Sequence, residues 1–288
     1  LNLIMGVQAV RADREVKSKS PIGVTTKNVE QTYHAINPRL GAIYALNQDV
    51  DLFASVSRLY EPPTTYQLDD GVNAVALDAM KGVVAEVGTR GTRSFGQENS
   101  WSWDLSVFYS ELEDEILSEE DPAALGTFIT TNVDKTIHAG VEALIHSKIA
   151  LGDNGKHSLA PMASVTFNHF RFDDNDTFGN NDLPGAPKHV LKGEVIYHHE
   201  NGFYAGPTMD VVGERYADFT NSYKVSSYTI FGLRTGWESE KLTVFVEAQN
   251  ILDKDYISTH SVRTNATDAD QILNPGAGAS IYAGFEVK

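Results

Sequence analysis

The chain of 288 residues contains no cysteine. This absence excludes disulfide frameworks, thiolate-bound metal sites and cysteine nucleophiles. The chain also lacks any run of eighteen apolar residues, which excludes a membrane-spanning helix. Basic residues are scarce, because 23 Lys and Arg stand against 39 Asp and Glu, and the formal net charge is -16. Such a chain repels phosphate backbones, so we expect no nucleic acid among its partners.

The first residues lack the pattern of a secretory leader. The stretch "LNLIMGVQAVRADREV" has no basic segment followed by an apolar block, so no signal peptide is visible. Leu3, Met5, Val7 and Ala9 instead share one parity, as they would on one face of a strand. We therefore expect the sequence to begin inside a longer protein.

Apolar and polar residues alternate along most of the chain. Between Leu242 and Gln249 only Phe245 breaks the alternation, and Trp101 to Ser110 repeats the same pattern. Eight steps separate Trp101 from Tyr109, which is roughly 26 Å of strand at about 3.3 Å per residue. A strand tilt near 40° reduces this length to about 20 Å of height, comparable to an apolar membrane band with aromatic residues at both edges.

About twelve strands are predicted, and the links between them alternate between short and long. The predicted strands are residues 1–12, 38–47, 51–60, 80–92, 100–115, 127–150, 157–171, 188–199, 203–216, 226–238, 241–258 and 278–288. The tight links are 47–49, 95–99, 151–156, 200–202 and 239–240, and the long ones are 13–37, 61–79, 116–126, 172–187, 217–225 and 259–277. In an up-and-down meander this alternation places all tight turns at one end, which is typical of outer-membrane barrels and not of Greek-key sandwiches.

The apolar face of such strands meets either a dry core, as in a soluble sandwich, or lipid, as in a membrane barrel. Asp104, Glu142 and Glu247 lie near the centres of the opposite, polar faces. Burying any of these carboxylates unpaired would cost several kcal/mol, so a water-filled lumen is favoured. The sequence therefore predicts an all-β, antiparallel up-and-down transmembrane β-barrel, with short periplasmic turns and long extracellular loops.

Five short strings add a resemblance to a known family. They are "LYEPPTTYQL" (59–68), "KGVVAEVGTRG" (81–91), "NVDKTIHAGVEAL" (132–144), "LPGAPKH" (183–189) and "NILDKDY" (250–256). In this order they resemble strand and loop segments of TonB-dependent outer-membrane receptors. The resemblance implies a barrel of about 22 strands with a plugged lumen. Residues 1–288 then correspond to the C-terminal part of the barrel domain, with the plug, the first strands and the TonB box in a missing N-terminal region.

The resemblance also implies a function. Such receptors are integral to the bacterial outer membrane, contact its lipid, and take up a scarce chelate with energy from the TonB–ExbB–ExbD complex. No covalent cofactor and no enzymatic step are implied. A ferric siderophore or ferric citrate is the expected cargo, and cobalamin, another cofactor, heme or an oligosaccharide is an alternative. A passive porin-like channel, a surface adhesin or hydrolase, and a soluble β-sandwich module are the competing classes.

The long loops are where ligand specificity is expected. Cationic and aromatic side chains would suit a planar, anionic iron chelate. The candidate ligand-binding residues are Tyr66, Arg215, Tyr216, Phe219, Tyr223 and Arg263. The alternative is that these residues only border the membrane or lie in solvated loops.

Signals for catalysis or metal binding are poor. No Gly-x-Ser-x-Gly motif occurs, so no catalytic residue is proposed. The segment "FDDNDTFGNND" hints at a calcium loop, but counting from Asp174 puts Phe178 at the third ligand position and Gly185 at the twelfth. His198 and His199 project to opposite faces of a strand, so no metal site is proposed there either.

Overall fold

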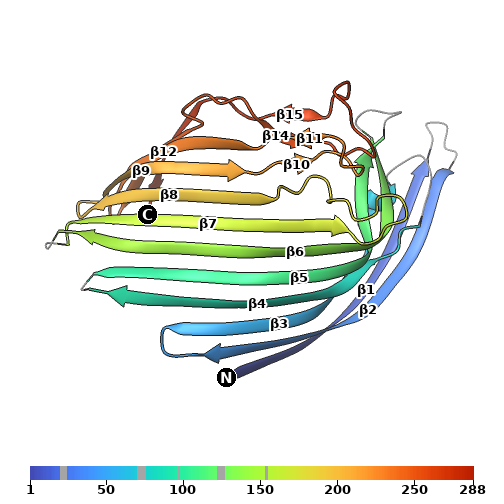
Figure 1. The fold of residues 1–288 in the computed structure, drawn as a ribbon, viewed down its shortest axis with the longest axis horizontal. Helices are drawn as coiled ribbons and strands as arrows, with labels where there is room; N and C mark the ends of the chain where they lie inside the picture. Colours follow the sequence, from blue (N-terminus) through green and yellow to red (C-terminus); the bar gives the residue numbers. More distant parts are fainter. Residues whose placement is uncertain (20–24, 70–75, 97, 122–126, 153–154) are drawn as a thin grey trace.

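The computed structural model describes the whole chain except residues 20–24, 70–75, 97, 122–126 and 153–154 (Figure 1). Twelve strands form one antiparallel sheet in which each strand pairs with the next along the chain. The strands are β1 (Asn2–Lys19), β2 (Thr25–Ala45), β3 (Val50–Glu61), β4 (Met80–Phe95), β5 (Asn99–Glu120), β6 (Phe128–Leu151), β7 (His157–Phe172), β8 (His189–His199), β9 (Phe203–Val212), β12 (Tyr228–Glu238), β13 (Leu242–Gln249) and β16 (Ser280–Val287). The predicted number of strands and their antiparallel, up-and-down order are confirmed.

The sheet is a single curved wall with two different ends (Figure 1). Both termini and the tight turns that lead into β3, β5, β7, β9 and β13 lie at one end, which we call the turn end. The opposite loop end carries the longer links, the helix α1 (Thr65–Asp69) and two small hairpins. These hairpins are β10 (Arg215–Tyr216) with β11 (Lys224–Val225), and β14 (Ile257–His260) with β15 (Leu273–Pro275). The tight turns are therefore all at one end, as predicted, and most longer links are at the other, but β1 and β2 are joined there by only five residues and not by a long loop.

The wall is not closed. Within the described residues, β1 pairs only with β2 and β16 only with β13, so each has one free edge. The described part of the chain holds no helix with the length and hydropathy that a bilayer crossing requires.

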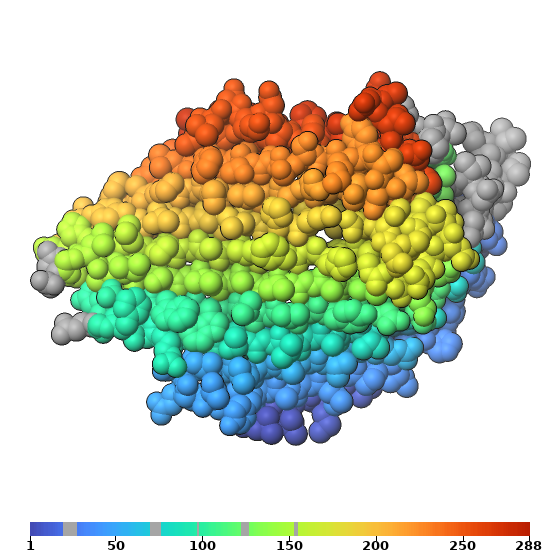
Figure 2. Space-filling model, viewed as in Figure 1, coloured from blue at the N-terminus to red at the C-terminus, as the bar shows by residue number. Residues whose placement is uncertain are grey.

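The apolar face of the wall is uncovered. Leu105 is 41% exposed and Val244 is 37% exposed, and Val165 is only partly buried. No second layer of described residues packs on this face, which is the outer face of a barrel wall. Figure 2 shows the wall as a smooth surface from which the 173–187 loop stands out as a lobe at the loop end. The dry core of a soluble sandwich is therefore excluded for this chain.

Aromatic rings on the polar, inner face lie on glycines of neighbouring strands. Phe245 is directly opposite Gly284, and Phe108 is directly opposite Gly140. The pairs Phe53–Gly88 and Tyr204–Gly236 have the same register. A glycine leaves room for the ring, and the ring covers the backbone that glycine exposes. Phe245 breaks the sequence alternation because its ring fills the space over Gly284.

Two long loops were predicted where the structure has strands. β1 continues to Lys19 and β2 begins at Thr25, so most of the predicted loop 13–37 is paired hairpin. Similarly, β5 continues to Glu120 instead of ending before a loop at 116–126. Beyond the apolar band both faces of a strand are polar, so alternation disappears while backbone pairing continues.

Two predicted strands are too long. The strand predicted at 241–258 ends at Gln249, because Asn250 and Asp253 have positive φ angles of 48° and 49°. The buried Asn250 side chain accepts a hydrogen bond from Lys254 N at 2.9 Å and donates one to Lys254 O at 2.9 Å. The "NILDKDY" segment therefore begins with a turn that the Asn250 side chain stabilises. The strand predicted at 203–216 ends at Val212, and the chain resumes pairing only in β10.

Candidate functional site at the loop end

A kink in β5 turns the end of the β5–β6 hairpin. Asp114 has φ of 55° inside the strand, and its carbonyl accepts a hydrogen bond from Asn132 Nδ2 at 2.8 Å. Beyond the kink Glu115 is buried on the inner face, where His138 Nε2 lies 3.0 Å from its carboxylate. Figure 1 shows the ends of β5 and β6 leaving the line of the wall. A residue in the left-handed region re-aims the side chains that follow it.

An aromatic core joins the loops at this end. Phe172, Leu183 and Phe219 are buried against one another, although they come from β7 and two different loops. The Phe172 and Phe219 ring centroids are 5.8 Å apart in an edge-to-face arrangement, and Phe178 lies 5.4 Å from Phe219. Buried aromatic pairs stabilise their surroundings by about 0.5–1.5 kcal/mol beyond area burial. The loops are therefore packed together.

Asp218 organises the 217–225 loop. Its side chain is fully buried and accepts hydrogen bonds from the amides of Ser222 and Tyr223 at 3.0 Å and of Ala266 at 3.3 Å. The Thr220 hydroxyl also donates to it at 2.7 Å. Burial acts to raise the pKa of Asp218, but the hydrogen bonds together outweigh it and hold the pKa below the ordinary value.

The segment Val262–Thr264, which we call the strap, is held on both sides by backbone hydrogen bonds. Glu120 N donates to Val262 O at 2.8 Å on one side, and Arg263 N donates to Ala217 O at 3.1 Å on the other. The Arg263 guanidinium is 3% exposed, donates to Glu120 O at 3.0 Å and lies 3.4 Å from the Glu120 carboxylate. This arginine therefore fastens the strap to the end of β5.

Arg215 binds the backbone of another loop. It is 5% exposed, and its Nη2 donates to Ile257 O and Ser258 O, both at 3.1 Å. His260 Nε2 lies 3.3 Å from Tyr216 O. Burial, and then the Arg215 charge, lower the pKa of His260, while the contact with Tyr216 O opposes them. These contacts tie β10 to β14.

The structure brings five of the six predicted ligand-binding residues together. Arg215, Tyr216, Phe219, Tyr223 and Arg263 all lie in the loop assembly described above. Their exposed surface differs, because both arginines and Phe219 are buried while Tyr216 and Tyr223 are partly exposed.

Tyr66 stands apart from the other five. It is 70% exposed on α1, whose Leu68 packs with Val29 of β2 and Leu77. Asp218, Glu120 and His260, which hold the loops in position, were not predicted from the sequence. Only Asp218 had a signal, because an Asp followed by Thr, Asn and Ser in "DFTNSY" is typical of a side-chain-capped turn.

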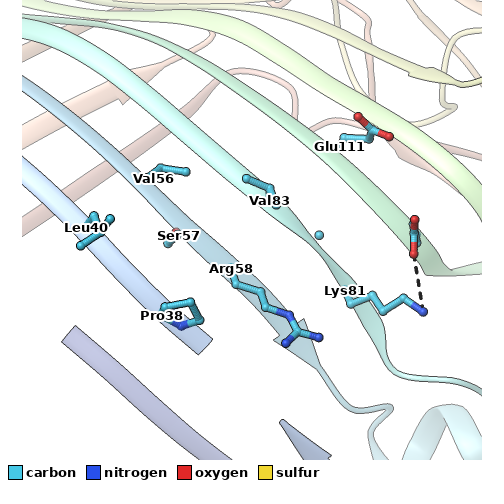
Figure 3. Close-up of a pocket in the computed structure, with 10 residues that line it drawn as sticks. Pro38, Leu40, Val56, Ser57, Arg58, Lys81, Val83 and Glu111 are labelled. Atoms are coloured by element: carbon cyan, nitrogen blue, oxygen red, sulfur yellow. Dashed lines mark ion pairs between the residues drawn. The ribbon is translucent and has the colours of Figure 1, made fainter. Parts of the chain in front are cut away.

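A groove lies on the apolar face, away from the loop assembly (Figure 3). β2 and β3 pair from Arg39 opposite Ser57 toward the turn end, and Pro38, which has no N–H, marks where they separate. Arg58 Nη1 donates to Ile36 O at 3.2 Å across the gap. The groove has a volume of about 600 Å³ and is lined by apolar side chains together with Arg58, Lys81, Glu111 and Glu113.

Across the residues that the structure describes, no group of three or more His, Asp or Glu side chains is placed to hold a metal ion.

Comparison with known proteins identifies the relatives of this chain. Residues 1–251 match the family model described as TonB dependent receptor-like, beta-barrel. The ferric-pyoverdine BN7/BN8 receptor of Pseudomonas putida is 23% identical over 259 residues. The match covers 90% of this chain and 30% of that receptor, so the chain spans less than a third of its curated relative.

Solved structures share the fold. The siderophore receptor PiuA from Acinetobacter baumannii has a TM-score of 0.74 at 14% identity, covering 99% of this chain and 40% of PiuA. The copper transporter OprC has a TM-score of 0.72 at 18% identity, covering 98% of this chain and 44% of OprC. The ferric citrate transporter FecA has a TM-score of 0.70 at 18% identity, covering 98% and 42%. At these identities the likeness shows the fold alone.

Proposed function

Because the chain belongs to the family of TonB-dependent receptor-like β-barrels, we propose that it is part of an outer-membrane receptor that takes up a metal chelate. The cargo in this proposal is a ferric siderophore or ferric citrate, and the energy comes from the TonB–ExbB–ExbD complex. One observation carries the proposal: a single antiparallel wall has an uncovered apolar face, a charged opposite face and all its long loops at one end.

The inner face supports a wet lumen. Arg234 on β12 lies 2.8 Å from the Glu194 carboxylate on β8 and 3.5 Å from the Glu247 carboxylate on β13. Arg90 lies 3.6 Å from Asp51 nearer the turn end. Ion pairs of this kind tolerate water and not acyl chains. The polar face therefore suits the lumen of a transporter.

We also place further parts of the receptor upstream of residue 1. The free edges of β1 and β16 leave backbone groups that the membrane interior cannot satisfy. Additional strands between these edges would close the barrel, and a plug within it would control passage. We place the energy-coupling box in the same upstream region. Residues 1–288 are, in this proposal, the C-terminal part of the barrel domain.

The loop assembly is the proposed ligand-binding end. Tyr66, Tyr216 and Tyr223 have exposed ring surface that could contact a chelate. Arg215, Phe219 and Arg263 would act by holding the loops in position, because their polar or aromatic surface is already in contact with this chain. Uptake requires binding and passage only, so no catalytic residue is proposed.

A growth assay tests the function. The full-length receptor, expressed in a strain deleted for its own receptors, should permit growth on at least one ferric siderophore or ferric citrate as the sole iron source. Deleting tonB in the same strain should abolish that growth, because the cargo moves against its gradient. Growth that persists without TonB would instead indicate a passive channel, and no growth on any ferric chelate would direct the search to cobalamin, heme or oligosaccharides.

A further inference from the structure

The β1–β2 hairpin extends past the strand that flanks it in the sheet (Figure 1). β2 pairs with β3 only as far as Arg39, opposite Ser57, and β3 itself ends at Glu61. Two prolines follow Glu61 in the sequence, and proline has no N–H with which to continue a strand ladder. Residues 28–37 of β2 therefore pair with β1 on one side and with no strand of the described chain on the other.

The contact of Arg58 identifies the backbone groups that face this open side. Arg58 Nη1 donates to Ile36 O at 3.2 Å, so the carbonyl of Ile36 points away from β1. In an antiparallel strand the N–H and C=O of one residue point to the same side, and residues two apart repeat that direction. The backbone groups of Glu30, Thr32 and His34 therefore also face the open side, where they have no backbone partner among the described residues.

The open side belongs to a firmly held strand. Val29 and Tyr33 on its inner face are 6% and 5% exposed, and the Tyr33 hydroxyl donates to Leu77 O at 2.8 Å. Val29 packs with Leu68 and Leu77. Because the strand is already ordered, pairing a further strand with it costs little conformational entropy on the receptor side. The edge is therefore a template to which an extended segment can add.

The outer face of this edge is polar and carries an acidic side chain without a counter-charge. Glu30 lies directly opposite Glu15 of β1, and like charges in that position repel each other. Lys17 pairs with Glu15, whereas Glu30 forms no ion pair within the part of the chain that the structure describes. From Glu30 to His34 the outward side chains are all polar and exposed, so the edge lies beyond the apolar band of the wall.

We propose that the open edge of β2, residues 28–36, binds an extended peptide segment of a partner protein in which cationic and apolar side chains alternate. The cationic side chains lie beside Glu30 on the outer face, and the apolar ones lie beside Tyr33 on the inner face. The partner meets the receptor outside the cell, a position that rests on the proposed function, whereas the free edge does not. A second copy of the receptor fits less well, because copies in one membrane share an orientation and would offer β2 in the slightly less stable parallel pairing.

Amide hydrogen exchange in the full-length receptor tests whether the edge is free. The amides of Glu30, Thr32 and His34 should exchange quickly, because they face the open side. Those of Gln31 and Tyr33 should exchange about tenfold or more slowly after correction for intrinsic rates, because they face β1. Equal protection of all five amides would show that another part of the receptor already covers the edge, and would overturn the proposal.

A labelled eight-residue peptide of alternating Lys and Val is the probe for binding. Fluorescence anisotropy should show saturable binding to the purified full-length receptor in detergent, and the bound peptide should slow exchange at Thr32 and His34. His34→Pro should weaken binding by about tenfold or more, because it removes an N–H that faces the peptide and leaves the hydrogen bonds to β1 in place. His34→Ala is the matched control, because it keeps that N–H and should bind the peptide as the unchanged receptor does.

Charge variants separate recognition of the edge from general attraction, because the chain has a formal net charge of -16. Glu30→Gln should weaken binding by about two- to fivefold, whereas the same change at the exposed Glu240 of the turn end, Glu240→Gln, should have little effect. Equal effects of these two variants, or of His34→Pro and His34→Ala, would overturn the proposal, as would absence of binding by the unchanged receptor. None of these results depends on chelate uptake, which the growth assay measures separately.

Discussion

At the scale of single residues, the loop arginines bind their own protein. Arg215 and Arg263 were predicted as cationic contacts for an anionic chelate, and they remain proposed members of the ligand-binding end. In the structure Arg215 Nη2 donates hydrogen bonds to Ile257 O and Ser258 O. Arg263 Nη1 donates one to Glu120 O. The property that suits arginine to anions, a rigid fork of N–H donors, suits it equally to joining loops.

His260 makes the loop assembly sensitive to pH. Burial and the Arg215 charge hold its pKa below the ordinary value of about 6.5, so the folded loop favours the neutral ring. The undocked loop binds a proton more readily, so this stabilisation is present above about pH 6.5 and is lost progressively as the pH falls below it. Amide exchange at Ser261, whose N–H donates to Ile272 O, should accelerate between pH 7.5 and 5.5 after correction for intrinsic rates.

The control for this pH effect is His260→Gln, which keeps a polar side chain and cannot titrate in that range. It should flatten the pH dependence of exchange at Ser261. An equally steep dependence in the variant would assign the effect to another group, with the nearby carboxylates as the first to examine.

At the scale of elements, two features of the strands could not be read from alternation. One is the kink at Asp114, where a single positive φ angle turns Glu115 inward. The other is the pairing of inner-face aromatics with glycines, which depends on strand register and not on position along one strand. Phe245 breaks the alternation of its own strand, and the reason, Gly284 opposite it, lies on another strand.

The aromatic–glycine pairs should contribute to the stability of the wall. A side chain at Gly140 would place its Cβ 2.5 Å from Phe108 Cζ and 2.4 Å from Phe167 O. Gly140→Val should therefore lower the free energy of unfolding of the full-length receptor by about 1–3 kcal/mol. Urea unfolding in detergent, followed by intrinsic fluorescence, measures the difference.

Gly193→Val on the interior strand β8 is the matched control, because a Cβ at Gly193 meets no atom closer than 3.7 Å. Gly193→Val should change the free energy of unfolding much less than Gly140→Val. Equal losses in the two variants would show that the cost belongs to any glycine in a strand and not to displacement of the Phe108 ring.

At the scale of the whole molecule, acidic residues concentrate at the loop end. Residues 111–121 contain seven Asp and Glu, residues 173–182 contain four, and neither segment has a Lys or Arg. Five cations from neighbouring segments pair with some of these eleven carboxylates, so the negative charge is only partly offset; they are Lys81, Lys135, Arg171, Lys188 and Arg263. The resulting field should repel anionic cargo during approach, and screening by salt should weaken that repulsion.

Association rates test the sign of this field. For the full-length receptor, the association rate constant of an anionic ferric chelate should rise between about 10 and 150 mM salt, because the screening length falls from roughly 30 to 8 Å. A neutral ferric hydroxamate should show little change over the same range. Rapid-mixing fluorescence quenching measures both rates. A rate for the anionic chelate that falls with added salt would mean that cationic groups dominate its approach.

The amino-acid sequence alone determined the wall. The number and order of the strands, the places of the tight turns and the outward apolar face all follow from two-residue periodicity and turn composition, which are local properties, whereas the strand ends at the loop end do not. The family was also predicted from the sequence, because its short strings are local; two lie within β4 and β6, and the others lie at strand ends and in links, such as residues 250–256.

Only the tertiary structure decided what happens at the loop end. The ends of β5 and β6, the Asp218 turn and the strap depend on contacts between residues as far apart as Glu120 and Arg263. At that end both faces of the strands are polar, so no periodicity remains in the sequence. An arginine there is buried when the folded loops bring carbonyls and carboxylates from distant parts of the chain into contact with it.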